Sequence, residues 1–327
     1  MIPLSDPDLQ RNTTPYVNVA LIIINILIFA VQFLAFNAVQ DFEFIMRYGL
    51  IPFEITSGTL CEGEILAGYN QIIDCTSPIP TWATIFSSMF LHGGFFHFAG
   101  NMLFLWVFGD NIEDYLGHVK YLVFYLLCGV AAALFQIMFN PQSTVPMIGA
   151  SGAISGVMGA YILLYPNSQI RTIVWFIFIT FMKIPAKVLL GIWFLMQIYH
   201  GLGSSSALGG SAIAYWAHIG GFIAGLVSMK LFVAISAKHM RRSDKKHKAI
   251  YQEHRAEFSS WLKDQMIRTG LSPNDLATIT NIDINTINNW LTNVSVPSQT
   301  ASVFIAYALG VSVQTVLAIT EKNNTEN

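Results

Sequence analysis

One serine and one histidine are the residues of this sequence whose types and surroundings are best suited to chemistry. Ser151 and His218 each lie among glycines within a long apolar stretch. A serine hydroxyl and an imidazole act as nucleophile and general base in many hydrolases. A soluble serine hydrolase adds a carboxylate that orients the base, but no Asp or Glu occurs between Asp114 and Asp244. The pair therefore predicts a catalytic dyad whose imidazole is oriented by packing.

A second pair of polar residues lies in an earlier apolar segment. His97 and Asn101 are four residues apart, so they project from one face of a helix. Polar side chains at bilayer depth usually face the protein interior and mark function, although either residue alone is better explained by a hydrogen bond between helices. Because they share a face and accompany Ser151 and His218, we favour a functional role.

The composition indicates a membrane protein. Apolar residues make up 54% of the chain and charged residues 11%, against about 25% charged in soluble domains, and the mean hydropathy is +0.52. A membrane-spanning helix needs roughly 20 apolar residues. Six segments reach or approach that length, and they cover residues 17–39, 94–109, 119–139, 148–165, 187–203 and 215–236. A shorter apolar run over 173–182 is interpreted as a re-entrant or interfacial piece on the cytoplasmic side.

The distribution of charge predicts the orientation of these segments. The loop 40–82 holds six acidic residues and a single basic one, whereas 166–187 and 238–248 are basic. Lys and Arg collect on the cytoplasmic side of membranes, so we expect both termini inside and the 40–82 loop outside. Residues 1–14 lack the pattern of a removable signal peptide. We expect a multi-pass protein of a bacterial plasma membrane.

The three cysteines allow one disulfide. Cys61 and Cys75 lie in the predicted outer loop, where a disulfide can persist, and Cys128 lies in the third apolar segment. Two free thiols are the alternative, since sequence does not reveal the geometry that bonding requires. The sequence predicts no metal site and no cofactor.

Small residues recur at helical spacing in the fourth and sixth segments. They are Gly149, Gly152, Gly156 and Gly159 in the fourth and Ala217, Gly221 and Gly225 in the sixth. Small residues four apart let helix backbones approach closely. Such stripes of small residues usually indicate only that two helices pack closely, but here close packing would also bring Ser151 and His218 together.

Two of these stretches resemble motifs of the rhomboid family of intramembrane serine proteases. The sequence Gly149-Ala-Ser-Gly152 resembles the family's G-x-S-G motif, and residues 217–225 resemble its A-H-x-x-G-x-x-x-G motif. His97 and Asn101 resemble the oxyanion residues of the family. Residues 109–117 resemble its G-x-x-x-E-x-x-x-G turn, whose fixed positions here are Gly109, Glu113 and Gly117. The resemblance covers roughly residues 15–236.

The resemblance implies a six-helix protease core that cleaves transmembrane segments of other proteins, with small residues near the cut. Ser151 would attack a peptide carbonyl while His218 takes and returns its proton, and His97, Asn101 and the Ser151 N–H would bind the oxyanion. Some members carry a tyrosine four residues after the nucleophile, but Ser155 stands there in this chain. Another group must therefore orient the imidazole. The segment 201–211 is interpreted as either a lid or a plain linker.

The last part of the chain is polar and helical in pattern. Predicted helices begin at Ser259, Ser272 and Asp283, and two more cover 298–309 and 312–320. Their spacing resembles a helix-turn-helix of the phage-repressor (Cro-like) class. Segment 251–327 has four Lys or Arg and seven Asp or Glu, so it lacks the basic surface that is the first sign of a DNA-binding domain.

The third of these helices carries asparagines that could read adenine edges, although exposed polar residues are the more ordinary explanation. They are Asn285, Asn288 and Asn289. We favour a cytoplasmic module for protein interaction or self-association, with DNA binding as the alternative. The basic stretch before it suits membrane topology and anionic lipid headgroups.

The sequence thus predicts an all-α protein with four parts. They are a cytoplasmic segment 1–16, a rhomboid-like bundle 17–237, a basic linker 238–250 and a helix-turn-helix domain 251–327. The leading hypothesis is an intramembrane serine endopeptidase, acting on transmembrane proteins in the lipid bilayer. A catalytically silent binder of transmembrane helices and a membrane-tethered regulator are the alternatives.

Overall fold

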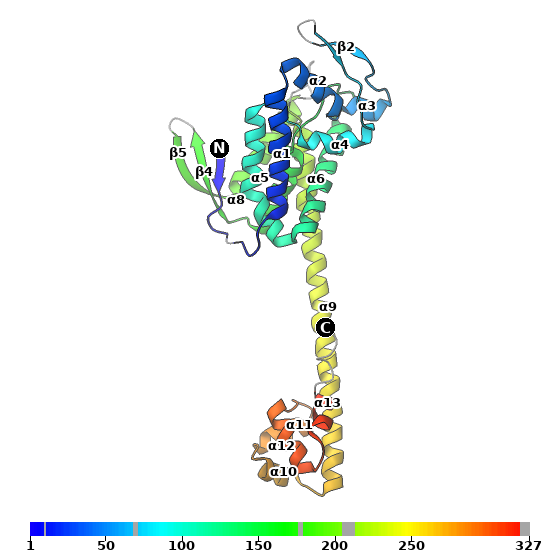
Figure 1. Ribbon diagram of the computed structural model, residues 1–327. Helices are drawn as coiled ribbons and strands as arrows, with labels where there is room; N and C mark the ends of the chain where they lie inside the picture. Colours follow the sequence, from blue (N-terminus) through cyan, green and yellow to red (C-terminus); the bar gives the residue numbers. More distant parts are fainter. Residues whose placement is uncertain (10, 68–70, 176–178, 205–212, 321–327) are drawn as a thin grey trace. The chain divides into compact units, whose positions relative to one another are not determined.

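The protein is described here by a computed structural model covering residues 1–9, 11–67, 71–175, 179–204 and 213–320. Contacts divide it into two compact units, Met1–Val233 and Ala234–Asn327. Figure 1 shows the elements of each unit. Most of the described chain is helical.

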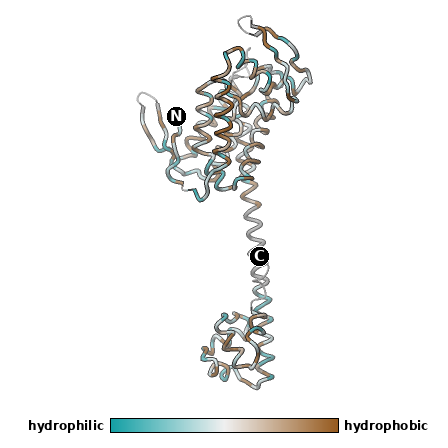
Figure 2. The backbone as a smooth tube through the Cα atoms, in the orientation of Figure 1, coloured by the Kyte–Doolittle hydropathy of each residue, from teal (hydrophilic) through white to brown (hydrophobic). Residues whose placement is uncertain are grey.

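Long helices form the first unit. They are α1 (Tyr16–Ala35), α5 (Phe95–Leu116), α6 (His118–Phe139), α7 (Ser151–Leu164), α8 (Ala186–Ser204) and the start of α9 (Tyr215–Thr269). α7 is the central helix, since every position from Gly152 to Tyr161 is buried and it contacts α5, α6 and α8. In Figure 2 the helices of this unit are mostly hydrophobic along their length.

Three helices among the described residues are long and apolar enough to cross a membrane. They are Tyr16–Ala35, His118–Phe139 and the first part of α9, Tyr215–Ile235. Each coincides with one of the six apolar segments expected from sequence. The other three segments are also helical, as α5, α7 and α8. The chain is therefore a membrane protein, and a bundle of six spans stays a prediction.

The expected outer loop is structured. It contains most of α2 (Ala38–Tyr48), α3 (Pro52–Ser57), the hairpin β2 (Glu64–Ala67) and β3 (Gln71–Asp74), and the start of the short helix η2 (Thr81–Ala83). The short helices α4 (Thr84–Ser87) and η3 (Ser88–Phe90) follow it. A disulfide joins Cys61 and Cys75 beside the hairpin. Of the two alternatives left open by the sequence, the structure has the bonded one. Cys128 is a free, buried cysteine.

The expectation of an all-α fold was wrong in detail, because two small sheets are present. β4 (Gln169–Trp175) pairs antiparallel with β5 (Ile179–Pro185), and β1 (Ile2–Ser5) pairs with β4 to give the order β1-β4-β5. The described residues 173–175 and 179–182 of the apolar run expected as a re-entrant or interfacial piece belong to β4 and β5. The Thr, Ile, Val and aromatic residues of this run favour strands, and the run is too short for a spanning helix.

The second unit contains four short helices and the end of α9. They are α10 (Pro273–Thr280), α11 (Ile284–Leu291), α12 (Gln299–Leu309) and α13 (Val313–Thr320). Their buried core includes Phe258, Leu262, Leu276, Ile287 and Trp290. Ser272 and Asp283 cap α10 and α11 through their side chains. The assignment of this unit as a helix-turn-helix stays a prediction.

α9 continues without interruption through the stretch expected as a linker, 238–250. No Gly or Pro occurs between Ala234 and Thr269, and the segment is rich in Ala, Lys, Arg, Glu and Gln, which favour helix. Gly270, with φ of +69°, ends the helix.

Candidate active site

The site is built where α7 and α9 touch. A β-carbon added to Gly221 on α9 would lie 2.0 Å from the carbonyl oxygen of Gly152 on α7. A distance below 3.0 Å is too short for any side chain, so only glycine at this position lets the two backbones meet. The contact brings the first turn of α7 against the first turns of α9.

Ser151 and His218 lie on these two facing turns. Nε2 of His218 is 2.8 Å from Oγ of Ser151, a hydrogen-bond distance. Ser151 is the first residue of α7, so its backbone N–H belongs to the helix terminus that has no intrahelical acceptor. The structure therefore brings the two residues together and leaves a backbone donor beside the hydroxyl.

A third residue completes the contacts of the imidazole. Oε1 of Gln197 on α8 is 2.8 Å from Nδ1 of His218, and Gln197 is buried. The ring of Trp193, one turn earlier on α8, lies 5.9 Å from the imidazole between centroids. Sequence reasoning missed Gln197, although a glutamine within a predicted membrane span was a signal of function.

Ser155 occupies the position where some rhomboids carry a tyrosine, and its hydroxyl is used within its own helix. Oγ of Ser155 donates to the carbonyl oxygen of Ser151 at 2.6 Å. Ser155 is fully buried. Besides Ser151, the groups that contact His218 are therefore Gln197 and Trp193 of α8, and not the residue four positions after Ser151.

His97 and Asn101, both on α5, lie beside the loop that leads into α7. A β-carbon at Gly149 would be 2.8 Å from Nε2 of His97 and 3.6 Å from Nδ2 of Asn101, and Gly149 has φ of +116°. Nδ2 of Asn101 is buried and has no hydrogen-bond partner among the described residues. An unpaired buried donor is unusual, and this one lies near Gly149, which precedes Ser151 by two residues in the chain.

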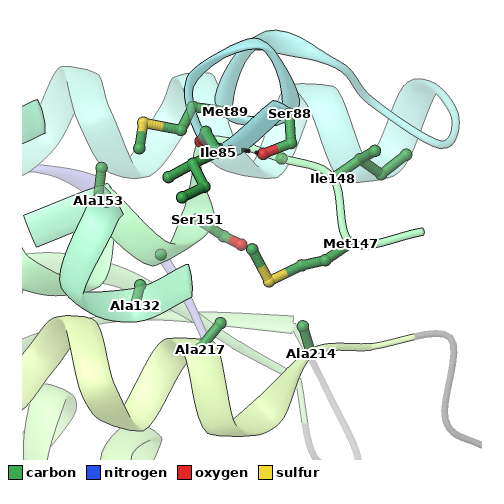
Figure 3. Close-up of a pocket in the computed structure, with 13 residues that line it drawn as sticks. Ile85, Ser88, Met89, Ala132, Met147, Ile148, Ser151, Ala153, Ala214 and Ala217 are labelled. Atoms are coloured by element: carbon green, nitrogen blue, oxygen red, sulfur yellow. Dashed lines mark hydrogen bonds between the residues drawn. The ribbon is translucent and has the colours of Figure 1, made fainter. Parts of the chain in front are cut away.

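A small pocket opens beside the serine. Figure 3 shows Ser151 among the residues that line it, which include Ile85, Met89, Ala132, Met147 and Ala217. The lining is apolar apart from Ser88 and Ser151. Met89 also lies against Gly129, where an added β-carbon would be 2.5 Å from its terminal methyl group. The pocket therefore suits a small apolar side chain.

The segment Gly109–Gly117, expected to be a turn, is helical up to Leu116, and this expectation was wrong. Gly117 alone turns the chain, with φ of +76°. Glu113 is fully buried and accepts the backbone N–H groups of Val17 at 2.9 Å and Asn18 at 2.7 Å. Because these N–H groups belong to the first turn of α1, Glu113 fixes the start of α1 against α5.

The remaining expectations concern the lid or linker 201–211 and a metal site. Gly201–Ser204 form the last turn of α8, and the rest of the expected lid or linker, residues 205–211, lies outside the described residues. Within the described ranges, no three His, Cys, Asp or Glu side chains come together as metal ligands would.

Residues 80–235 match the family model of the Rhomboid domain. Rhomboid protein 1, mitochondrial, of Saccharomyces cerevisiae is 30% identical over 166 residues, which are 49% of this chain and 44% of that protein. Rhomboid-like protein 11, chloroplastic, of Arabidopsis thaliana is 25% identical over 175 residues, 51% of this chain and 58% of that protein.

A bacterial relative matches a shorter segment. Rhomboid protease GluP of Bacillus subtilis is 38% identical over 84 residues, 26% of this chain and 16% of that protein. The chain spans less than two thirds of the length of each of these relatives. Together the matches support a rhomboid-family protein.

Proposed function

We propose that this membrane protein, whose residues 80–235 match the family model of the Rhomboid domain, is an intramembrane serine endopeptidase. The observation that carries the proposal is the 2.8 Å contact between Nε2 of His218 and Oγ of Ser151. The substrates would be transmembrane segments of other proteins in the same bilayer. The reaction needs no metal and no cofactor.

The proposed mechanism has two halves. His218 removes the Oγ proton of Ser151 as Oγ attacks the scissile carbonyl carbon, giving a tetrahedral oxyanion. The intermediate collapses when the C–N bond breaks, and the protonated imidazole gives its proton to the leaving amine. Water, deprotonated by His218, then attacks the acyl-enzyme ester, and its collapse releases the acid and returns the proton to Ser151.

The oxyanion would be bound by His97, Asn101 and the N–H of Ser151. The unpaired Nδ2 of Asn101 supports this role, because a donor left free in the resting protein is available for the charge that develops in the transition state. The position of Gly149 against both side chains supports it as well. Any larger residue there would separate α5 from the loop before Ser151.

The small pocket supports a preference for a small residue at the cut. Ala132, Met147 and Ala217 line the pocket together with Ser151. A transmembrane helix must also unwind locally for its carbonyl to reach a serine, since helical carbonyls are already hydrogen-bonded. We therefore propose cleavage at small, weakly helical positions of a transmembrane segment.

A serine-reactive probe and a model substrate test the proposal together. The purified protein in liposomes should react with a fluorophosphonate and cleave a single-pass transmembrane substrate. Ser151→Ala should do neither, and His218→Ala should lose cleavage with the bundle still folded. Ser155→Ala is the matched control, since it removes a buried hydroxyl one turn away that bonds only its own helix.

The same experiment separates the alternatives. A silent binder of transmembrane helices would hold the substrate without cleaving it and would not label at Ser151. A membrane-tethered regulator would not cleave the substrate, and its regulatory activity would be the same in the wild type and in Ser151→Ala. Unchanged cleavage by both Ser151→Ala and His218→Ala would refute the proposed roles.

We propose six spanning helices with both termini in the cytoplasm. Support comes from α5 and α8, which expose large apolar side chains that a bilayer would cover, among them Phe96 and Trp106 on α5 and Leu195 and Leu202 on α8. The basic residues of 166–187 and 238–248 favour this orientation. We propose a bacterial plasma membrane, although the first two relatives are named as mitochondrial and chloroplastic.

For the second unit we propose a cytoplasmic module with a Cro-like helix-turn-helix fold that binds a protein partner. Its acidic balance of four basic and seven acidic residues over 251–327 supports a partner other than DNA. A gel shift of the full-length protein in detergent, with randomised duplex at low salt, tests this. Recovery of a specific sequence would establish DNA binding and overturn the proposal.

A further inference from the structure

We infer that Gln197 is the positioning residue that holds His218 in the tautomer and orientation a general base requires. The inference rests on the proposed function, because it assigns the group that completes the dyad. Gln197 belongs to α8, Ser151 to α7 and His218 to α9. Three helices would therefore contribute one side chain each to a single line of hydrogen bonds.

The orientation of the amide follows from a second contact. Nε2 of Gln197 lies 3.4 Å from the carbonyl oxygen of Trp193, one turn earlier on α8. That carbonyl can only accept, so it must face the amide NH₂ group. Turning the amide over would set two oxygens against each other. Oε1 of Gln197 is thus the atom that faces Nδ1 of His218, at 2.8 Å.

The tautomer of the imidazole follows in turn. Because Oε1 is an acceptor, Nδ1 of His218 must carry the proton. In the neutral ring Nε2 then has a free lone pair, and it lies 2.8 Å from Oγ of Ser151. This is the arrangement in which a serine donates to its base. With the other tautomer, Nε2–H would donate to the hydroxyl and could not accept its proton.

The surroundings limit the movement of both side chains. Gln197 has 8% of its surface exposed, and the ring of Trp193 lies tilted against the imidazole. Gln197 differs from the aspartate of a serine triad in one respect, since it carries no charge. It selects the tautomer and stabilises the imidazolium through a neutral hydrogen bond.

The chemistry predicts different behaviour for two replacements. Gln197→Met keeps the length of the side chain and removes the acceptor, so kcat for the model transmembrane substrate should fall about tenfold to a hundredfold with KM little changed. Gln197→Glu keeps an acceptor toward Nδ1 and should restore most of the rate. Its added negative charge favours the protonated ring, so activity should rise only at higher pH than in the wild type.

The experiment compares wild type, Gln197→Met, Gln197→Glu and the control Leu195→Met, an exposed position on the same helix. Rates of substrate cleavage and of fluorophosphonate labelling are measured across pH, with circular dichroism and thermal melting as checks of folding. A folded Gln197→Met with lowered kcat, together with recovery in Gln197→Glu, supports the inference. A Gln197→Met rate within twofold of wild type, or a Gln197→Glu as slow as Gln197→Met at every pH, overturns it.

Failure of the proposed function would look different. In that case the wild type itself would neither label nor cleave and would match Ser151→Ala. If the wild type labels and cleaves but the Gln197 variants have wild-type rates, the Ser151–His218 dyad would stand and only the positioning role of Gln197 would be refuted.

Discussion

Gly225 of α9 lies directly against Gly156 of α7, so that a β-carbon on Gly225 would be 1.9 Å from the carbonyl oxygen of Gly156. Gly225 follows His218 by seven residues, which is two helical turns, so both face α7. The register that lets these glycines meet is therefore the register that brings the imidazole to Ser151.

Gly225→Ala should separate the two helices. The methyl group has no room beside the Gly156 backbone, so we expect a loss of stability of about 1–3 kcal/mol and a large loss of fluorophosphonate labelling. Gly191→Ala on α8 is the control, because nothing lies within 4 Å of its added β-carbon. Thermal melting in detergent and the labelling rate would be measured together. Normal labelling of Gly225→Ala would contradict the argument that close backbone approach positions the dyad.

Asn101→Ala should slow the chemistry without unfolding the bundle. Nδ2 of Asn101 makes no hydrogen bond among the described residues, so little is lost in the resting protein. Removing one oxyanion donor typically lowers kcat by about 10²–10³. We expect that loss in the cleavage of a model transmembrane substrate, with KM nearly unchanged. The exposed Asn167 provides an Asn→Ala control, and a kcat for Asn101→Ala equal to that control would exclude the donor role.

The helix contacts and helix caps could be predicted from the sequence because they depend on the spacing of nearby residues. Small residues four apart predicted that α7 and α9 pack closely, and the contact of Gly221 with Gly152 agrees with that prediction. The caps Ser272 and Asp283 were likewise local, since a capping side chain reaches only two or three residues ahead.

Other features depend on long-range geometry that no pattern in the chain expresses. Gln197 and His218 are 21 residues apart, and their contact depends on the rotation of α8 about its axis. The pairing of β1 with β4 joins Ile2 to Ile173, and neither segment alone predicts the other. The helical state of 109–116 was missed because the resemblance to the rhomboid motif implied a turn there, whereas Glu113 lies within α5 and accepts hydrogen bonds from the start of α1.

Glu113→Ala should destabilise the first unit. The carboxylate is fully buried and accepts two backbone N–H groups at the start of α1, together with a contact of 2.5 Å to Nδ1 of His118. Hydrogen bonds to a charged group contribute about 1.5–3 kcal/mol each, and an unpaired buried donor adds its own penalty. We expect a loss of roughly 3 kcal/mol or more in the free energy of unfolding.

Thermal melting in detergent would measure this loss, with Asp264→Ala as the control. Asp264 forms an exposed ion pair with Arg268 at 2.9 Å, and such pairs contribute about 0–1 kcal/mol. A melting temperature for Glu113→Ala as high as that of Asp264→Ala would show that α1 is held by other contacts.

Asp114 should make the attachment of the N-terminal segment depend on pH. Burial raises the pKa of Asp114, but hydrogen bonds from Thr13 and Asn12 outweigh it and leave the pKa below its ordinary value of 3.8. The backbone N–H of Thr13 donates at 2.7 Å and that of Asn12 at 3.1 Å. A carboxyl with a lowered pKa stabilises the folded state above its ordinary pKa, and the contribution is lost as pH falls through the lowered value.

We therefore expect Asn12 and Thr13 to be protected from hydrogen exchange at pH 7 and at pH 5, and to lose protection progressively as pH falls below the ordinary pKa of 3.8, after correction for the intrinsic exchange rate. In Asp114→Asn the charge is absent, so protection should be weak and independent of this titration. The amides of α7, whose first turn carries Ser151, should stay protected throughout and serve as the internal reference. Equal protection of Thr13 at pH 5 and pH 3 in the wild type would show that the ionised carboxylate does not hold this segment.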